Sequence, residues 1–162
     1  MYVPFEELAE DARIWIYPSD TPFKEEDMES VEQRLKDFIH QWTVHNKALK
    51  ASFLLPYRRF VVLAVDTAFN QVSGCSIDSS VRFIQELEHE FSKVLLDKMN
   101  VTFKQGEYLV YKDLKDFKAL VKSKSVSPET IVFNNMISTI DELETQWEVS
   151  VNNSWHKRFL VS

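Results

Sequence analysis

The sequence predicts an α+β fold with a ferredoxin-like β-α-β-β-α-β antiparallel sheet core, helices on one face of that sheet, and a C-terminal α/β extension. Apolar runs typical of strands occur at residues 13–17, 50–55, 60–66 and 101–104. Two long stretches with apolar residues at helical spacing separate the first run from the second and the third run from the fourth. This order of elements is the split βαβ arrangement of ferredoxin-like sheets.

The first 66 residues are expected to form one helix and three strands. The alternating strand 13–17 ends at Pro18, and residues 19–22 predict a helix start with Pro22 at the first helical position. The gap between the strands at 50–55 and 60–66 is short enough for a hairpin. One face of the first helix is apolar, at Met28, Val31, Leu35, Phe38, Ile39 and Trp42.

The second long helix is expected to begin at Asp78, which is a good N-cap residue, and to run to about Met99. Asp78 and Arg82 have the i,i+4 spacing of an ion pair on a helix surface. Its apolar face is expected at Val81, Ile84, Leu87, Phe91 and Leu95.

The C-terminal part predicts smaller elements. We expect a hairpin around Gly106, a helix over 114–121, a strand over 130–133, and a short helix that opens with a capping box at Thr139. The tail from Asn152 has no clear period. We therefore expect one globular domain over 1–162, with the core in 1–104 and the hairpin, helix, strand, helix and tail of the extension in 105–162.

Composition limits the possible classes of protein. The chain has 162 residues, of which 44% are hydrophobic and 13% aromatic, and this argues against disorder. The formal net charge of −6 makes a nucleic-acid binder an unfavoured class, because such a protein needs a basic surface. One cysteine excludes an intrachain disulfide and a cysteine-based zinc cluster. The sequence has no run long enough to span a membrane and no signal-peptide pattern at its start, so we expect a cytoplasmic protein that does not enter the membrane.

The stretch 73–80 is the candidate ligand-binding site. It follows a buried strand and precedes a helix, and such a junction offers unpaired N–H groups and the positive end of the helix dipole to an anion. The residues concerned are Ser73, Gly74, Cys75, Ser76, Asp78, Ser79 and Ser80. The alternative is structural, since these hydroxyls and the carboxylate could only cap the helix and Cys75 could be a small buried hydrophobe.

Two further arrangements would suit catalysis. Cys75 could act as a nucleophile with a histidine as its base, and His156 in the tail is the histidine we would pair with it. Asp66 at the end of a strand and Asp78 at the start of a helix could together hold a divalent metal such as Mg²⁺. The alternative is that both aspartates are unrelated caps.

Asn134 and Asn135 follow the last predicted strand. They could orient a ligand beside the 73–80 stretch, or they could form an Asx turn. No cofactor is expected.

Phosphate-loop and dinucleotide-binding sites are excluded by the glycines. A phosphate loop needs Gly-x-x-x-x-Gly-Lys-Ser/Thr, whereas the two glycines here, Gly74 and Gly106, are followed by Cys75 and Glu107. P-loop ATPase activity is therefore not expected.

The sequences Ser-Gly-Cys-Ser-Ile-Asp-Ser-Ser at 73–80, Phe-Asn-Asn at 133–135 and Trp-His-Lys-Arg-Phe-Leu at 155–160 carry a resemblance. Over nearly its whole length, the chain resembles a family of short bacterial proteins of the Bacteroidetes group that often carry the automated name ABC transporter ATPase. Residues 72–76 are similar to the ABC signature Leu-Ser-Gly-Gly-Gln, but the second glycine and the glutamine are missing. The resemblance implies no catalytic residue, and without a phosphate loop it does not support the ATPase name.

Together these observations favour a non-enzymatic ligand-binding or protein-interaction domain that uses the 73–80 stretch and the helix N-terminus. The partner is expected to be a small anion or a protein, with a homodimer as one option. The alternative is a small hydrolase or transferase that uses Cys75 as nucleophile or a divalent metal held by Asp66 and Asp78.

Overall fold

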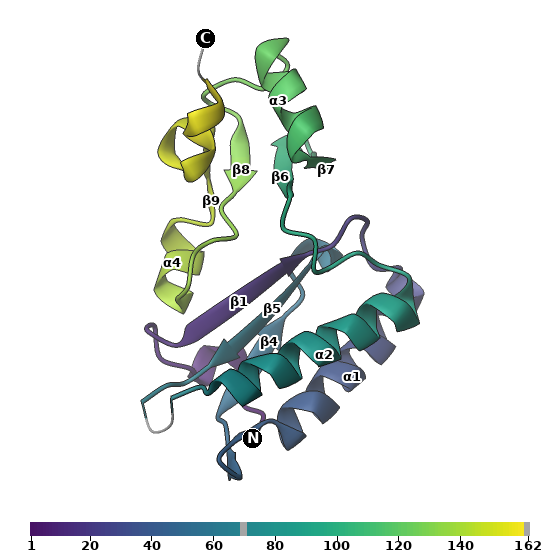
Figure 1. Ribbon diagram of the computed structural model, residues 1–162, viewed down its shortest axis with the longest axis vertical. Coiled ribbons are helices and arrows are strands. Elements are labelled where there is room, and N and C mark those ends of the chain that lie inside the picture. The colour runs from purple at the N-terminus through teal and green to yellow at the C-terminus, as the bar shows by residue number, and fades with distance from the viewer. Residues whose placement is uncertain (69–70, 161–162) are drawn as a thin grey trace. The chain divides into compact units, whose positions relative to one another are not determined.

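The computed structural model describes residues 1–68 and 71–160 of the chain. The fold is mixed α+β with antiparallel sheets, as the sequence predicts. It divides into two compact units (Figure 1), where the sequence led us to expect one domain with an extension. Unit one is Met1–Leu96 with Ser138–Asp141, and unit two is Asp97–Ile137 with Glu142–Ser162. The single domain over 1–162 stays a prediction.

The sheet of unit one has three antiparallel strands. They are β1 (Arg13–Pro18), β4 (Ala51–Leu54) and β5 (Phe60–Val65), in the order β1-β5-β4. All six residues of the central strand β5 are buried. Such burial is expected of a strand with a continuous run of apolar, β-branched residues. The bounds of all three strands agree with the prediction to within two residues.

Two antiparallel helices, α1 (Met28–Gln41) and α2 (Gly74–Phe91), lie side by side on one face of this sheet (Figure 1). Alternate residues of β5, namely Val61, Leu63 and Val65, point to the helices and share a core with them. The helices contribute Val31, Leu35, Ile39, Phe83, Ile84 and Leu87 to this core. The helical spacing of apolar residues therefore identifies the buried faces, although Met28, Phe38, Val81 and Phe91 are only half-buried and Leu95 lies beyond the end of α2.

Both helix starts differ from the prediction. Residues 19–22 do not open a helix: α1 begins at Met28, after a 3₁₀ turn at Glu25–Asp27. Helix α2 begins at Gly74 with Ser73 as its N-cap, four residues before the predicted start, and it ends at Phe91. Both Ser73 and Asp78 are good capping residues, and local preference alone could not choose between them.

The segment between α1 and β4 forms a small hairpin that the sequence did not reveal. Strands β2 (Thr43–Val44) and β3 (Lys47–Ala48) pair around His45 and Asn46, which have φ values of 48° and 64°. Two consecutive positive φ values are the requirement of a tight two-residue hairpin turn, and Asn-Gly or Asp-Gly is its usual signal. The pair His45-Asn46 lacks the glycine and was missed.

Unit two has a second sheet of four antiparallel strands. They are β6 (Asn100–Gln105), β7 (Tyr108–Asp113), β8 (Ile131–Phe133) and β9 (Glu148–Ser150), in the order β7-β6-β8-β9. Strand β6 is the run at 101–104 that we expected to complete the first sheet. It pairs with β7 and β8, so the six-element core expected over 1–104 is not formed as predicted.

The remaining elements are α3 (Leu114–Lys122), α4 (Ile140–Thr145) and two 3₁₀ helices in the tail, Val151–Asn153 and Trp155–Leu160. The tail packs in unit two: the Phe117 ring of α3 lies 6.0 Å from the rings of both His156 and Phe159, measured between centroids. His156 and Phe159 of the tail therefore pack in the core of this unit, whereas Asn152 and Asn153 are exposed. In the part of the chain that the structure describes, no helix has the length and apolar character needed to cross a bilayer.

Candidate functional site

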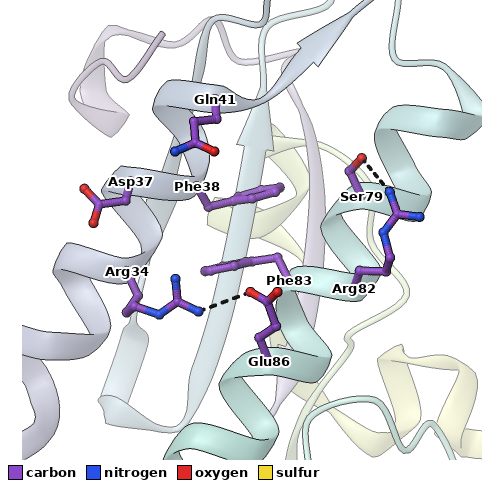
Figure 2. A pocket seen from close by; sticks show the side chains of 8 residues that line it. All are labelled: Arg34, Asp37, Phe38, Gln41, Ser79, Arg82, Phe83 and Glu86. Atoms are coloured by element: carbon purple, nitrogen blue, oxygen red, sulfur yellow. Dashed lines mark hydrogen bonds and ion pairs between the residues drawn. The ribbon is translucent and has the colours of Figure 1, made fainter.

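A groove of about 240 Å³ lies between α1 and α2, on the side of the helices away from the sheet core (Figure 2). Its walls and floor come from these two helices alone, so it is a feature of unit one. The residues that line it are Arg34, Asp37, Phe38 and Gln41 of α1 and Ser79, Arg82, Phe83 and Glu86 of α2.

Two phenyl rings form the floor of the groove. Phe38 and Phe83 stack with centroids 4.3 Å apart and planes only 5° from parallel. Figure 2 shows both rings edge-on between the two helices. The Phe38 ring also lies 5.1 Å from the Trp42 ring, which anchors it to the end of α1. The floor is therefore apolar and held in one arrangement by its neighbours.

Arg34 closes one end of the groove. Its guanidinium donates to Glu90 at 2.8 Å and to Glu86 at 3.1 Å, and it lies 5.6 Å from the centroid of the Phe83 ring. The hydrogen bond to Glu90, followed by that to Glu86, raises the pKa of Arg34 above its ordinary value. These contacts join α1 to α2, with Arg34 shared between the two carboxylates.

The other end of the groove carries hydrogen-bond donors. Arg82 is exposed and donates to the Ser79 hydroxyl at 3.3 Å. Gln41 on the opposite helix is also exposed and lines the same space. Within residues 1–68 and 71–160, Arg82 is in no ion pair, and in particular the i,i+4 pair predicted with Asp78 is not formed.

Three hydroxyls of the predicted 73–80 site are part of the fold. Ser73 caps α2 by accepting from the Ser76 N–H at 3.1 Å. The Ser76 hydroxyl donates to the Thr43 carbonyl at 2.7 Å, and the Trp42 indole N–H donates to the Ser76 carbonyl at 2.9 Å. The Ser80 hydroxyl donates to the Ile77 carbonyl at 2.6 Å.

Burial agrees with this assignment. Ser76 and Ser80 are 3% and 1% exposed. Ser80 also hydrogen-bonds Tyr17, whose pKa is raised by burial and lowered to a smaller extent by that bond. The capping alternative therefore accounts for Ser73, Ser76 and Ser80.

The other members of the stretch are accessible. Gly74, Cys75 and Asp78 are exposed, and Ser79 is half-buried in the groove wall. A Cβ at Gly74 would meet no other atom within 4 Å, so the fold does not require glycine there. Cys75 is exposed near the start of α2, so the alternative that it is a small buried hydrophobe is wrong.

His156 is not an accessible base. It lies in unit two, is 1% exposed, and its Nδ1 is hydrogen-bonded to the Ser154 hydroxyl. Burial, together with the nearby Arg158, lowers the pKa of His156 to about 4. The Trp155 and Phe117 rings pack against it. These features describe a neutral core histidine.

Of the two proposed metal ligands, Asp66 has other partners and Asp78 is exposed. Asp66 accepts from the Ala68 N–H at 2.9 Å and pairs with Lys50 at 3.8 Å. In the described segments, no three histidine, cysteine, aspartate or glutamate residues are grouped in a way that could hold a metal ion.

The asparagines after β8 form a turn. Asn134 accepts from the Met136 N–H at 3.2 Å, and Asn135 accepts from the Trp147 indole N–H at 2.8 Å. The first bond is that of an Asx turn, the structural alternative considered for this pair.

Comparison with protein-family models, with curated proteins and with solved structures finds no match to this chain. The groove therefore has to be interpreted from its own geometry. Sequence reasoning singled out Ser79 but missed Arg34, Phe38, Gln41 and Phe83 as site residues, because α1 contributes to the site only through its pairing with α2. The available signal was the position of Phe38 beside Ile39, at the edge of the apolar face of α1.

Proposed function

We propose that this protein is a non-enzymatic binding domain whose ligand site is the groove between α1 and α2. The observation that carries the proposal is the apolar floor of Phe38 and Phe83 with donors from Ser79 and Arg82 at one end. Small-molecule sites are typically apolar concavities with a few polar groups that fix orientation. The expected site thus moves from the whole 73–80 stretch to the half-buried Ser79 and the face of α2 that follows it.

A thermal-shift screen tests this proposal. Purified protein is heated with nucleotides, phosphate, sulfate, small carboxylates and divalent metals. A ligand at a hundred times its Kd adds about 2.7 kcal/mol to the free energy of unfolding, which raises Tm by roughly 5–11 °C for a domain of this size. We expect a shift that is reduced in Gln41→Ala and Arg82→Ala, both in the groove.

The matched control is Gln85→Ala, an exposed position on α2 that does not line the groove. We expect this variant to keep the full shift. A ligand-induced shift of equal size in all three variants would place the site elsewhere and overturn the proposal.

One observation favours an enzymatic alternative. Cys75 is exposed in the first turn of α2, an 18-residue helix. In this alternative the protein is a small hydrolase or transferase with Cys75 as nucleophile. The test is the rate of alkylation by iodoacetamide between pH 5 and 9: a rate that reaches half its maximum well below pH ~8.5 supports it, and the rate profile of an ordinary thiol excludes it.

Four further features are proposed: the fold variant of unit one, the family, the location and the oligomeric state. Strands β1, β4 and β5 with α1 and α2 follow the β-α-β-β-α order, which supports describing unit one as a variant of a ferredoxin-like fold. We keep membership of the Bacteroidetes-type family, a cytoplasmic location and a homodimer as proposals. Sedimentation of the purified chain decides the last of these.

A further inference from the structure

We propose that the groove between α1 and α2 takes a small organic anion with a flat apolar body, of the class of aromatic carboxylates. This inference rests on the proposed function and names the ligand class for the same site. It follows from the charges at the two ends of the groove, from the orientation of the phenyl rings, and from the size of the space.

The charges leave one cation available. Four charged side chains line the groove, two of each sign: Arg34, Arg82, Asp37 and Glu86. Arg34 is shared between Glu86 at 3.1 Å and Glu90 at 2.8 Å, so its charge is already engaged. Asp37 accepts from Gln33, and Figure 2 shows its carboxylate directed away from the two rings. Arg82 is the cation of the groove that is in no ion pair within residues 1–68 and 71–160, and its guanidinium is suited to a carboxylate because its N–H groups match the two oxygens.

Two neutral side chains support an anion at the same end. The Ser79 hydroxyl oxygen accepts from Arg82, so its own O–H is available to donate. The Gln41 amide on the facing helix has two N–H donors. A carboxylate between α1 and α2 could therefore accept from both helices.

The phenyl rings favour the same kind of ligand. Phe38 and Phe83 present their edges to the groove, and Arg34 covers the Phe83 ring (Figure 2). The edge of an aromatic ring is the positive part of its quadrupole, so it attracts either an anion or the face of another ring. An aromatic carboxylate offers both, with its ring on the phenyl edges and its carboxylate at Arg82.

The size of the groove favours a small ligand. Pockets for drug-sized molecules usually measure about 300–1,000 Å³. The groove measures about 240 Å³ and is closed at one end by the contacts of Arg34 with Glu86 and Glu90. A single substituted ring fits this space, and the open end lies next to Arg82.

The experiment uses four probes that separate charge from shape. Benzoate carries the ring and the anion, benzamide the ring without charge, benzylamine the ring with a positive charge, and acetate the anion without the ring. Each is titrated into the isotope-labelled chain and followed by NMR through the amide signals of α1 and α2 and the Nε–H signal of Arg82. We expect benzoate to shift the signals of Phe38, Ser79 and Arg82, and to bind at least about tenfold more tightly than the other three.

Two variants test the role of the charge. Arg82→Gln should weaken benzoate binding about tenfold or more, because the charge-assisted hydrogen bonds are lost. Lys47→Gln removes an exposed cation of β3 outside the groove and should leave the affinity unchanged. Equal affinity in both variants would overturn the assignment of Arg82.

The remaining outcomes separate the ligand class from the site. If benzamide or benzylamine shifts the groove signals as strongly as benzoate, the anionic class is wrong while the binding site stands. If acetate binds as tightly as benzoate, the flat apolar body is wrong. If none of the four probes shifts the groove signals, this inference fails, and the thermal-shift screen with the groove variants decides separately whether the proposed function stands.

Discussion

The N-terminal half of α2 carries polar side chains on two sides. On one side they hydrogen-bond to backbone carbonyls of the fold, and on the other they hydrogen-bond to each other at the groove. On the buried side, Ser76 donates to the Thr43 carbonyl and Ser80 to the Ile77 carbonyl, and both side chains are almost fully enclosed. On the exposed side, Ser79 and Arg82 hydrogen-bond each other and line the groove. Serines one helical turn apart therefore serve different purposes, and only burial distinguishes them.

His156 in unit two is also a buried polar side chain with a hydrogen bond inside the fold. The largest change in the free energy of unfolding is expected from this residue. Its pKa of about 4 in the folded chain lies below the ordinary value of 6.5, so the unfolded chain binds the additional proton between these two pH values. The contribution of the neutral ring is complete above about pH 6.5 and is lost as pH falls towards 4. The free energy of unfolding should decrease by up to about 3 kcal/mol across this range from this group.

Urea unfolding at several pH values measures this loss. In His156→Gln the pH dependence between 6.5 and 4 should be weaker than in the wild type, by the amount that this histidine contributes. The exposed His89 is the matched position, and His89→Gln should retain the wild-type dependence. Equal pH dependence in all three proteins would show that His156 is not buried in its neutral form.

The comparison within α2 predicts the next largest effect. Ser76→Ala removes the donor to the Thr43 carbonyl of the hairpin strand β2 and should lower the free energy of unfolding by about 1–3 kcal/mol. Ser79→Ala, one turn further along the helix, should change it by less than about 0.5 kcal/mol. The urea midpoints of the two variants measure the difference. If Ser79→Ala proved as costly as Ser76→Ala, the division into a structural and an accessible side would be wrong.

Replacement of Arg82 should affect ligand binding but not the free energy of unfolding. Arg82→Ala is expected to change the free energy of unfolding by no more than about 0.5 kcal/mol, because the side chain is exposed and its hydrogen bond to Ser79 is long. The same variant should lose most of its affinity for benzoate. Calorimetric unfolding and NMR titration of one sample check both statements, and a loss of stability above about 1 kcal/mol would contradict the first.

The smallest effect is expected at Gly74. An alanine Cβ there would meet no neighbouring atom, and the residue is helical with Ser73 as its cap. Gly74→Ala should therefore increase the free energy of unfolding by about 0.4–1 kcal/mol through the unfolded state. Thermal unfolding measures this change, and a destabilised variant would mean that the 73–80 stretch needs glycine for a reason that the helix geometry does not explain.

In unit one, the sequence predicts which helices and strands exist better than it predicts where the helices begin. The apolar spacing of α1 and α2 and the continuous run of β5 follow from local periodicity, and the three strands are found where expected. The start of α2 was misplaced because Ser73 and Asp78 are equally good caps. The choice depends on Trp42 and Thr43, which bond to Ser76 from more than 30 residues away.

Non-local pairing explains the other differences. The apolar run of β6 identifies a strand but not its partners, which are β7 and β8 in the second sheet. The groove could not be predicted either, because its floor joins Phe38 and Phe83, which are 45 positions apart and meet only through the antiparallel packing of two helices. Of the predicted ligand residues, Ser79 alone lines the groove.

The most direct test of the account is a crystal structure of the protein with 4-bromobenzoate, in which the anomalous signal of bromine locates the ligand. The account predicts a bromine position beside the Phe38 and Phe83 rings, with the carboxylate within hydrogen-bond distance of Arg82 and the bonds of Ser73 and Ser76 unchanged. A bromine peak at the first turn of α2 beside Gly74 and Cys75, or no peak in the groove, would contradict it.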